Sequence, residues 1–377
     1  MKKKIVFVSG TRADYGKIKN LIIKSQKIKN FQTHIFVTGM HNMNKYGLTY
    51  LQIYSDKIKN ISRFHNQKTN DRISNVVAKT IIGFSNFLIR TRPDIVIIHG
   101  DRIESLACAQ AAVFNNFKVA HIEGGEITGS LDEIIRHAIT KLSHIHFVSN
   151  YKAKKRLIQM GEKKDTIFNI GSTHLSLIKS KNLPKLSEVK NRYNIKYDKY
   201  GIFILHPITH DHDKFFKDVK KVINEIKKLN INFVIINPNN DFGSLFIFEQ
   251  YKKLKKLKNF KMIQSMRFEY YLTLLKNSRF IIGNSSSGII EAPYFGVPSI
   301  NLGNRQKNRS FTNCIKNVEF NKNKIIYYLK LYYKREKRYE KKDIYGTGNS
   351  ENKFISILKQ KRIWNFKFNK QFIDIKK

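Results

Sequence analysis

Acidic and basic side chains gather just beyond two strand-like segments of this sequence. The segments are DIVIIHG at residues 94–100 and KVAHIEG at residues 118–124, and a helical pattern follows each of them. The side chains are Asp101, Arg102, Glu104, Glu123, Glu126, Asp132, Glu133, Arg136 and His137. Ligands bind at the carboxyl ends of strands in an open α/β sheet, so this pattern delivers acids and bases to a ligand-binding edge. The alternative is that Asp101 and Glu123 are only helix caps and solvated loop acids.

A second group of residues favours binding of an anion. The stretch GNSSSGIIE at residues 283–291 follows a strand-like run and opens a helical pattern. Its backbone N–H groups, its serine hydroxyls and a helix dipole would attract phosphate. Arg305 lies beyond the next strand, and Arg12 directly follows the first strand, where an arginine suits bidentate phosphate binding. A serine-rich helix cap without a ligand is the alternative.

Histidines and aspartates cluster in HPITHDHD at residues 206–213. Metal binding is conceivable for such a set. The residues from His210 onward, however, stand where a helix starts and where solvated caps are common, so we expect no metal. We expect His206, directly after a strand, to contact phosphate or sugar.

Composition limits the class of protein. The chain has 377 residues, 41% of them hydrophobic, which suits two domains. Two cysteines cannot form a disulfide framework, so we expect a reducing cytoplasm. The N-terminal MKKKIVFVSG is expected to be a strand and not a signal peptide. No apolar run approaches the roughly 18 residues of a membrane span, so we expect no membrane partner.

The formal net charge of +43 raises the alternative of a nucleic-acid binder. The lysines are spread over all helix faces, and basic stripes interleaved with aromatic residues are not found, so we expect no nucleic-acid partner. The helical pattern from Asn321 to Lys342 is very basic. It is interpreted as a packing helix with a lysine-coated outer face, although a membrane or RNA helix is the alternative.

Strand-like and helical patterns alternate in both halves of the chain. This alternation predicts α/β architecture with parallel, doubly wound sheets. The polar, lysine-rich segment from Ser172 to Tyr200 is the expected linker. The predicted domains are residues 1–175, with the carboxylates, and residues 196–355, with the anion loop. Residues 356–377 are expected to form a terminal helix that crosses back to the first domain.

A set of motifs resembles one family. The motifs are GTRADYGK, HGDRIE, HIEGGEITGSLDEIIRHAITKLSHIHF, HPIT, NPNND, GNSSSGIIEA and NLGNRQ. Together they resemble the hydrolysing UDP-N-acetylglucosamine 2-epimerases of sialic acid biosynthesis. They are similar also to the related enzymes of legionaminic acid synthesis, which act on a diacetylbacillosamine nucleotide. The resemblance runs from residue 4 to about residue 310.

The resemblance implies a GT-B fold, with two Rossmann-like domains and an active site in the interdomain cleft. It implies catalytic roles for Asp101, Glu123, Asp132 and His206. The implied substrate-binding residues are Arg12, Arg102, Arg136, Asn239, Ser285, Ser286, Glu291 and Arg305. The chain departs from the family pattern at Glu133, where aspartate is usual, and at Ser287, where cysteine or glycine is usual. Neither departure removes an implied catalytic group, although Ser287 could alter the anion loop.

The reaction implied is conversion of UDP-N-acetylglucosamine and water to N-acetylmannosamine and UDP, without a cofactor. Inversion at C2 removes a proton from one face and returns one to the other, so at least two titratable groups must flank the sugar. A UDP- or GDP-diacetylbacillosamine is the alternative substrate. A GT-B glycosyltransferase is the alternative enzyme class, since it binds a nucleotide sugar in a similar cleft. A homodimer or homotetramer is expected.

Overall fold

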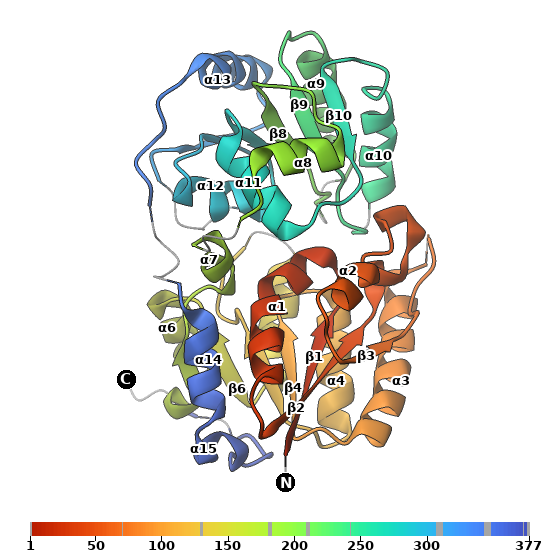
Figure 1. The fold of residues 1–377 in the computed structure, drawn as a ribbon, viewed down its shortest axis with the longest axis vertical. Coiled ribbons are helices and arrows are strands. Elements are labelled where there is room, and N and C mark those ends of the chain that lie inside the picture. The colour runs from red at the N-terminus through yellow and green to blue at the C-terminus, as the bar shows by residue number, and fades with distance from the viewer. Residues whose placement is uncertain are drawn as a thin grey trace. The chain divides into compact units, whose positions relative to one another are not determined.

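The computed structural model divides the chain into two compact units. It describes residues 2–69, 71–128, 131–179, 183–208, 212–241, 243–306, 312–342, 348–371 and 373–374. Unit 1 consists of Met1–Glu126, Asp132–Lys179 and Tyr345–Lys377, and unit 2 consists of Ile127–Leu131 and Ser180–Ile344. Each unit is an α/β sandwich built on one parallel sheet (Figure 1). Within the described segments, no helix has both the length and the apolar character needed to cross a membrane.

Seven parallel strands form the sheet of unit 1, in the order β3-β2-β1-β4-β5-β6-β7. The strands are β1 (Lys3–Ser9), β2 (Phe31–Val37), β3 (Asn60–Arg63), β4 (Ile95–His99), β5 (Val119–Ile122), β6 (Ile145–Val148) and β7 (Ile167–Asn169). The helices are α1 (Arg12–Gln26), α2 (Tyr50–Ser55), α3 (Ile73–Thr91), α4 (Ile103–Phe114), α5 (Leu131–Leu142), α6 (Tyr151–Gln159), α7 (Thr173–Ile178), α14 (Ser350–Leu358) and α15 (Lys361–Trp364). The central strands β4, β5 and β6 are buried along their whole length because helices cover both faces of a parallel sheet.

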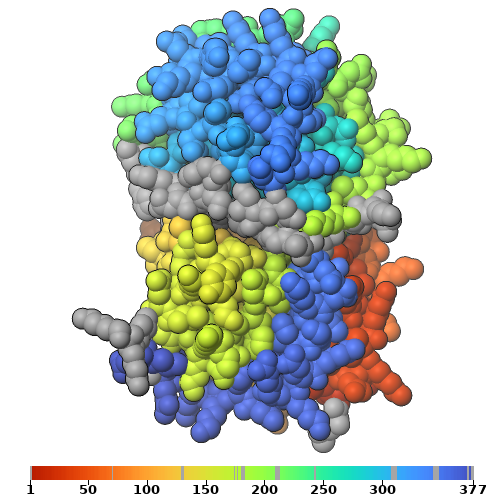
Figure 2. All heavy atoms as spheres, turned by 90° about the vertical axis from the view of Figure 1, so that its left-hand side faces the viewer, coloured from red at the N-terminus to blue at the C-terminus, as the bar shows by residue number. Residues whose placement is uncertain are grey.

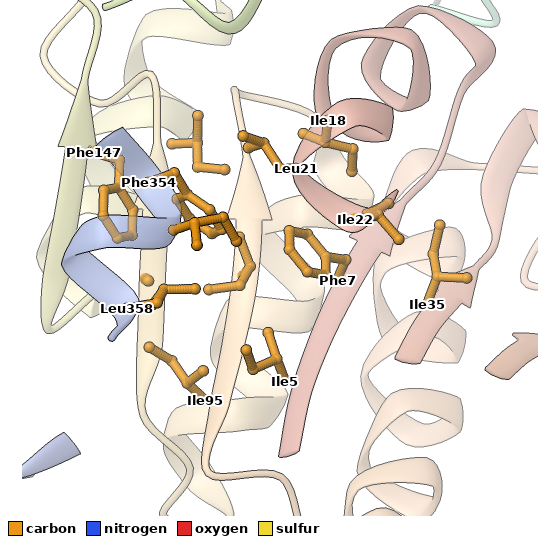
Figure 3. Close-up of a cluster of buried hydrophobic side chains, with 14 of the residues drawn as sticks. Ile5, Phe7, Ile18, Leu21, Ile22, Ile35, Ile95, Phe147, Phe354 and Leu358 are labelled. Atoms are coloured by element: carbon orange, nitrogen blue, oxygen red, sulfur yellow. The ribbon is translucent and has the colours of Figure 1, made fainter. Parts of the chain in front are cut away.

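The C-terminal segment packs on unit 1. Phe354 of α14 lies between Phe7 and Phe147, with ring centroids 6.1 and 4.8 Å away (Figure 3). On the surface the segment, coloured blue, lies between the yellow region around α6 and the red N-terminal region (Figure 2). Its first part, residues 350–355, therefore belongs to unit 1, whereas the sequence placed the boundary after residue 355. The buried Phe354 and Leu358 decide this, because both complete the core under α1.

Six parallel strands form the sheet of unit 2, in the order β10-β9-β8-β11-β12-β13. The strands are β8 (Gly201–Ile204), β9 (Phe233–Ile236), β10 (Phe260–Ile263), β11 (Ile281–Gly283), β12 (Ser299–Leu302) and β13 (Ile315–Val318). The helices are α8 (Leu186–Tyr193), α9 (His212–Lys227), α10 (Ser244–Lys252), α11 (Phe268–Asn277), α12 (Glu291–Tyr294) and α13 (Lys322–Lys334). In α13, Ile325, Leu329 and Tyr332 are buried in the core, as expected of a packing helix.

The predicted fold class of two doubly wound parallel sheets is confirmed. Strands β3 and β13, each at one edge of its sheet, are not apparent from the sequence pattern. Both are four residues long and mix polar with apolar residues, so neither shows the apolar run of a central strand.

Each sheet has one point where the strand order reverses. In unit 1 this point lies between β1 and β4, and in unit 2 it lies between β8 and β11. The loops that leave two such strands turn to opposite faces of the sheet, which opens a crevice beyond their carboxyl ends. Residues that follow these four strands are therefore placed where a ligand would bind.

Candidate active site

Asp101 lies at the reversal point of unit 1, two residues after β4. Gly100 adopts a positive φ of 73° and turns the chain there. Arg136, on α5, donates a hydrogen bond from Nη2 to Asp101 Oδ2 and another from Nη1 to the Glu126 carbonyl at 2.9 Å. The Arg136 side chain is 2% exposed and that of Asp101 is 30% exposed. The structure therefore joins two of the predicted residues in a charge pair with one carboxylate open to a ligand.

Arg136 is held as a cation. Burial opposes its charge, but Asp101 and then the nearby Asp132 and Glu126 outweigh burial and raise the pKa of the guanidinium. Asp132, on the first turn of α5, thus acts on the same arginine as Asp101. A group of predicted residues from three chain segments is therefore electrostatically coupled.

Glu123 follows β5, the strand next to β4. Its backbone has a φ of 67°, a left-handed conformation that costs free energy in a residue other than glycine. Its Oε2 lies 3.2 Å from His99 Nε2 and 3.8 Å from Lys17 Nζ. Strain of this kind is common where a side chain must be aimed precisely, and here it directs a carboxylate between two basic groups.

His99 and Lys17 were not assigned a role by the sequence analysis. His99 is the last residue of β4, and its 5% exposure indicates a side chain sealed beneath the edge. Lys17 lies on α1, within the GTRADYGK motif. Both residues lie within motifs noted in the sequence. Their partner, Glu123, is more than 20 residues away from each of them, and the sequence does not show such a pairing.

Arg12 follows β1 and Arg102 follows β4, the two strands at the reversal point of unit 1. Arg12 is the first residue of α1, capped by Thr11, and is half-buried. Arg102 Nε donates to Glu104 Oε2 at 3.2 Å, and Glu104 is fully buried. A Cβ atom at Gly39 would lie 2.7 Å from Glu104 Oε1, so the backbone at Gly39 packs directly on this carboxylate. Both predicted arginines thus stand at the carboxyl edge of the sheet.

Ser9, His41 and Asp14 form a buried network that resembles a hydrolytic triad in composition only. Ser9 Oγ lies 2.6 Å from Asp14 Oδ1 and 2.9 Å from His41 Nε2. The carboxylate thus binds the serine, whereas in a triad it orients the histidine. Burial lowers the pKa of His41 to about 4, and Ser9 is 0% exposed. The network fixes the loop that carries Arg12, and it has no route to a substrate carbonyl.

In unit 2, Asn284 organises the reversal point. It follows β11, and its side-chain amide pairs with the backbone of His206, which follows β8, through bonds of 2.7 and 2.8 Å. The Asn284 carbonyl accepts bonds from Arg305 Nη1 at 3.3 Å and from Gln306 Nε2 at 3.1 Å. The backbone N–H of Asn239 donates to His206 Nδ1 at 3.5 Å. Three predicted residues, His206, Asn239 and Arg305, are therefore gathered around an asparagine that had no predicted role.

The serine loop leads into a short helix. Ser285 caps a three-residue 3₁₀ turn, Ser286–Gly288, and the following α12 has four residues. The expected helix is therefore present, but so short a helix contributes only a small dipole. Ser285 and Ser286 are half-buried, whereas Glu291 is 3% exposed. The groups that this loop offers to an anion are therefore hydroxyl and backbone N–H groups.

Ser287 points away from the loop surface. Its hydroxyl shares a short hydrogen bond with the hydroxyl of Tyr271, on α11, and both residues are buried. Burial raises the pKa of the Tyr271 hydroxyl, and the charge of Glu291 raises it further. Ser287 is therefore part of the support of the loop.

Residues 209–211, which include His210 and Asp211 of the histidine cluster, lie outside the described residues. Among the residues that the structure does describe, no group of three His, Cys, Asp or Glu side chains could hold a metal ion. Gly129 and Ser130, between Glu123 and Asp132, also lie outside them.

The chain is similar to known proteins along most of its length. Residues 23–359 match the family described as UDP-N-acetylglucosamine 2-epimerase. The chain is 38% identical over 376 residues to the UDP-N-acetylglucosamine 2-epimerase of Neisseria meningitidis serogroup B, a match that covers 99% of both chains. The chain belongs to the UDP-N-acetylglucosamine 2-epimerase family.

Other members of the epimerase family extend the comparison. The UDP-N,N'-diacetylbacillosamine 2-epimerase (hydrolyzing) of Legionella pneumophila is 33% identical over 364 residues, covering 95% of this chain and 96% of the relative. The crystal structure of UDP-GlcNAc 2-epimerase from Neisseria meningitidis bound to UDP-GlcNAc has a TM-score of 0.76 at 21% identity, covering 94% and 99% of the two chains. This neighbour supports the predicted GT-B type of fold. The role of a nucleotide-sugar 2-epimerase, which the motifs predicted, is confirmed by the family.

Proposed function

We propose that this family member is a hydrolysing epimerase, which converts UDP-N-acetylglucosamine and water to N-acetylmannosamine and UDP. The observation that carries the proposal is the pair of carboxylates after β4 and β5, each held by its own basic partners. Asp101 is held by Arg136, and Glu123 lies between His99 and Lys17. Two acid–base groups on adjacent strands are what inversion at a carbon atom requires.

The reaction proceeds by elimination and then hydration. One carboxylate accepts the C2 proton while the C1–O bond breaks, and UDP leaves with the electron pair of that bond. A C1–C2 double bond forms in the resulting glycal. Water then adds its oxygen to C1 and gives one of its protons to a carboxylate of the site, while the second acid, which is protonated at this stage, delivers its proton to the opposite face of C2. Asp101 and Glu123 share these two roles, and Asp132 acts through Arg136. No electrons are gained or lost overall, so the reaction needs no redox cofactor.

Unit 2 supplies groups for the nucleotide diphosphate. Arg305 presents a cation on a side chain already bonded to the loop at Asn284. Ser285 and Ser286 offer hydroxyl and backbone N–H groups, and His206 and Asn239 complete the set. We assign Glu291 to the nucleoside or its ribose, and Arg12 and Arg102 to the anionic part of the substrate. Preorganised donors of this kind stabilise charge that develops on a departing phosphate.

The test is incubation of the purified protein with UDP-N-acetylglucosamine in D₂O. The expected products are UDP and free N-acetylmannosamine with deuterium at C2, measured by NMR and mass spectrometry. Release of UDP-N-acetylmannosamine in place of the free sugar would show a non-hydrolysing epimerase. Free sugar without deuterium at C2 would exclude proton abstraction.

The alternative substrate is a diacetylbacillosamine nucleotide, and the relative from Legionella pneumophila supports it. Both sugars carry an acetamido group at C2, so the elimination chemistry is shared. They differ at C4 and C6. A buried polar group left without a partner there can change the ratio of kcat/KM between two substrates by a large factor. A side-by-side assay of UDP-N-acetylglucosamine with UDP- and GDP-diacetylbacillosamine separates them. A preference of 100-fold or more for either bacillosamine nucleotide would replace the proposed substrate.

We further propose that the protein is cytoplasmic and forms a homodimer or a homotetramer. Light scattering tests the oligomeric state.

A further inference from the structure

We infer that His121 is a positioning residue for the reaction, which fixes the turn carrying Asp101 to the helix carrying Arg136. The inference rests on the proposed function, because it assigns a purpose to the geometry of that carboxylate. His121 lies within β5, is 0% exposed and cannot touch a substrate. Its two ring nitrogens nevertheless contact both segments that form the Asp101–Arg136 pair.

The contacts close a ring through the structure. His121 Nε2 lies 2.7 Å from the Gly100 carbonyl oxygen, and Nδ1 lies 3.1 Å from Thr140 Oγ1. Gly100 directly precedes Asp101. Thr140 follows Arg136 by one helical turn on α5, so both side chains leave the same face of the helix. The ring is completed by the hydrogen bond from Arg136 to Asp101.

The ring requires one tautomer of the imidazole. A carbonyl oxygen can only accept, so Nε2 must carry the hydrogen and donate it to Gly100. Nδ1 then accepts from the Thr140 hydroxyl. In a protonated imidazole Nδ1 would also carry a hydrogen, and the Thr140 hydroxyl would then accept instead of donate.

The surroundings keep His121 neutral. Burial lowers its pKa to about 3, and the groups facing it from neighbouring elements, His146 on β6, Arg136 on α5 and His99 on β4, oppose protonation further. The Gly100 carbonyl has the opposite effect but does not offset them. His121 is consequently excluded as the proton-transferring group, and its contribution is geometric.

The ring also explains a glycine in the IEGGE motif. A Cβ atom at Gly124 would lie 2.9 Å from His121 Nδ1 and 2.9 Å from Thr140 Oγ1. These two atoms are the ends of the hydrogen bond that ties α5 to His121. Any side chain at position 124 would push them apart, so the glycine preserves the ring.

Amide substitutions separate the two contacts. In His121→Gln the amide nitrogen reaches the position of Nε2 and can donate to Gly100, whereas in His121→Asn the amide reaches only the position of Nδ1. His121→Leu removes both contacts. We expect His121→Gln to keep kcat within about tenfold of wild type, and His121→Asn and His121→Leu to lose about 100-fold, the cost of a small misplacement of a reacting group. The Kd for UDP should change by less than about threefold in all three variants, because binding of UDP does not use Asp101.

Leu358→Ala is the control for a loss of stability alone. It truncates a buried residue of α14 that is far along the chain from the ring. This variant should lower the melting temperature and leave kcat unchanged. Equal loss of kcat in His121→Gln and His121→Leu, or a folded His121→Leu with full kcat, would overturn the inference. So would parallel loss of UDP affinity and kcat, which a purely structural role would produce.

Two readouts do not depend on epimerase activity. Nitrogen-15 NMR of labelled histidine should show the Nε2–H tautomer of His121, and the Nδ1–H tautomer would contradict the inference. A crystal structure of His121→Leu should show the Asp101–Arg136 contact broken, and an unchanged contact would likewise contradict it. Failure of the proposed function would appear separately, as wild-type protein that releases no free sugar although the ring is intact.

Discussion

The reversal points of the two sheets have the same topology but present different atoms. In unit 1 the residues that follow the strands carry carboxylates, and these carboxylates pair with basic side chains from helices. Examples are Asp101 with Arg136 and Glu123 with Lys17. In unit 2 the corresponding strands end in an amide, Asn284, and in serine hydroxyls, with Arg305 docked on a carbonyl oxygen. Titratable pairs suit proton transfer, whereas fixed neutral donors and one cation suit an anion that must be held and released.

The difference teaches that the fold supplies the location and the residues after the strands supply the chemistry. Under the proposed function, the reversal point serves acid–base catalysis in unit 1 and anion binding in unit 2. If this division is correct, substitutions in unit 1 should act on turnover and those in unit 2 on nucleotide affinity.

The largest expected effect is on turnover, from amide replacement of the carboxylates. Asp101→Asn and Glu123→Gln should each reduce kcat by roughly 10²-fold or more, as expected when a general acid or base is lost. UDP affinity, measured by calorimetry, should stay close to that of wild type. An amide variant with nearly full activity would show that its carboxylate is a cap or a loop acid, and the comparison between the units would fail at that residue.

Arg305→Ala should act on the nucleotide. Loss of a charge-assisted contact should weaken UDP binding by about 1.5–3 kcal/mol, and the effect should shrink at high salt if the site is open to solvent. The deuterium content of the product at saturating substrate should not change. Arg305→Lys is the matched control, which keeps the charge and loses the forked geometry. Unchanged UDP affinity in Arg305→Ala would move the phosphate site elsewhere.

Glu162 forms a buried cluster with His146 and Lys370 in unit 1. Glu162 is buried, which raises its pKa, but the hydrogen bond from His146 and the ammonium of Lys370 outweigh burial and lower the pKa from 4.5 to about 2. Because the folded pKa is depressed, the stabilisation is complete above pH 4.5 and is lost as the pH falls towards 2. At pH 3, wild type should have lost about 2 kcal/mol of this stabilisation relative to pH 7.

Glu162→Gln removes this carboxylate together with its effect on His146 and Lys370, whose pKa values Glu162 raises. Groups outside this cluster titrate equally in both proteins. The difference in unfolding free energy between wild type and Glu162→Gln, from urea titrations at pH 7 and pH 3, should shrink with acid. A difference that is independent of pH would show that the Glu162 cluster is not ionised as described.

The smallest effect is expected at Ser287. Its hydroxyl is engaged by Tyr271, so Ser287→Cys should change UDP affinity by less than about threefold, while the loss of one hydrogen bond costs about 1 kcal/mol of stability. Tyr271→Phe should destabilise the protein similarly, and the double variant should be less than additive. Tenfold weaker UDP binding in Ser287→Cys would place this hydroxyl in the anion site.

The sequence alone determined the architecture and most of the candidate residues. Apolar runs bounded by helical patterns predicted the central strands, because a parallel sheet buries both faces of each strand. Motifs directly after those strands predicted Asp101, Glu123 and Ser285, since a residue that follows a strand must lie at the sheet edge. The missed strands β3 and β13 lie at edges, where burial leaves a weaker pattern.

Tertiary structure decided which residues meet. Arg136 and Asp101 are 35 positions apart, and Glu123 gains Lys17 and His99 only because β5 lies beside β4 and α1 follows β1. The role of Asn284, and the ring through His121, depend on the direction in which a side chain leaves its strand. Local sequence determines the strand and the residue on it, but the partners of that residue are distant in the chain, so only the folded sheet brings them into contact.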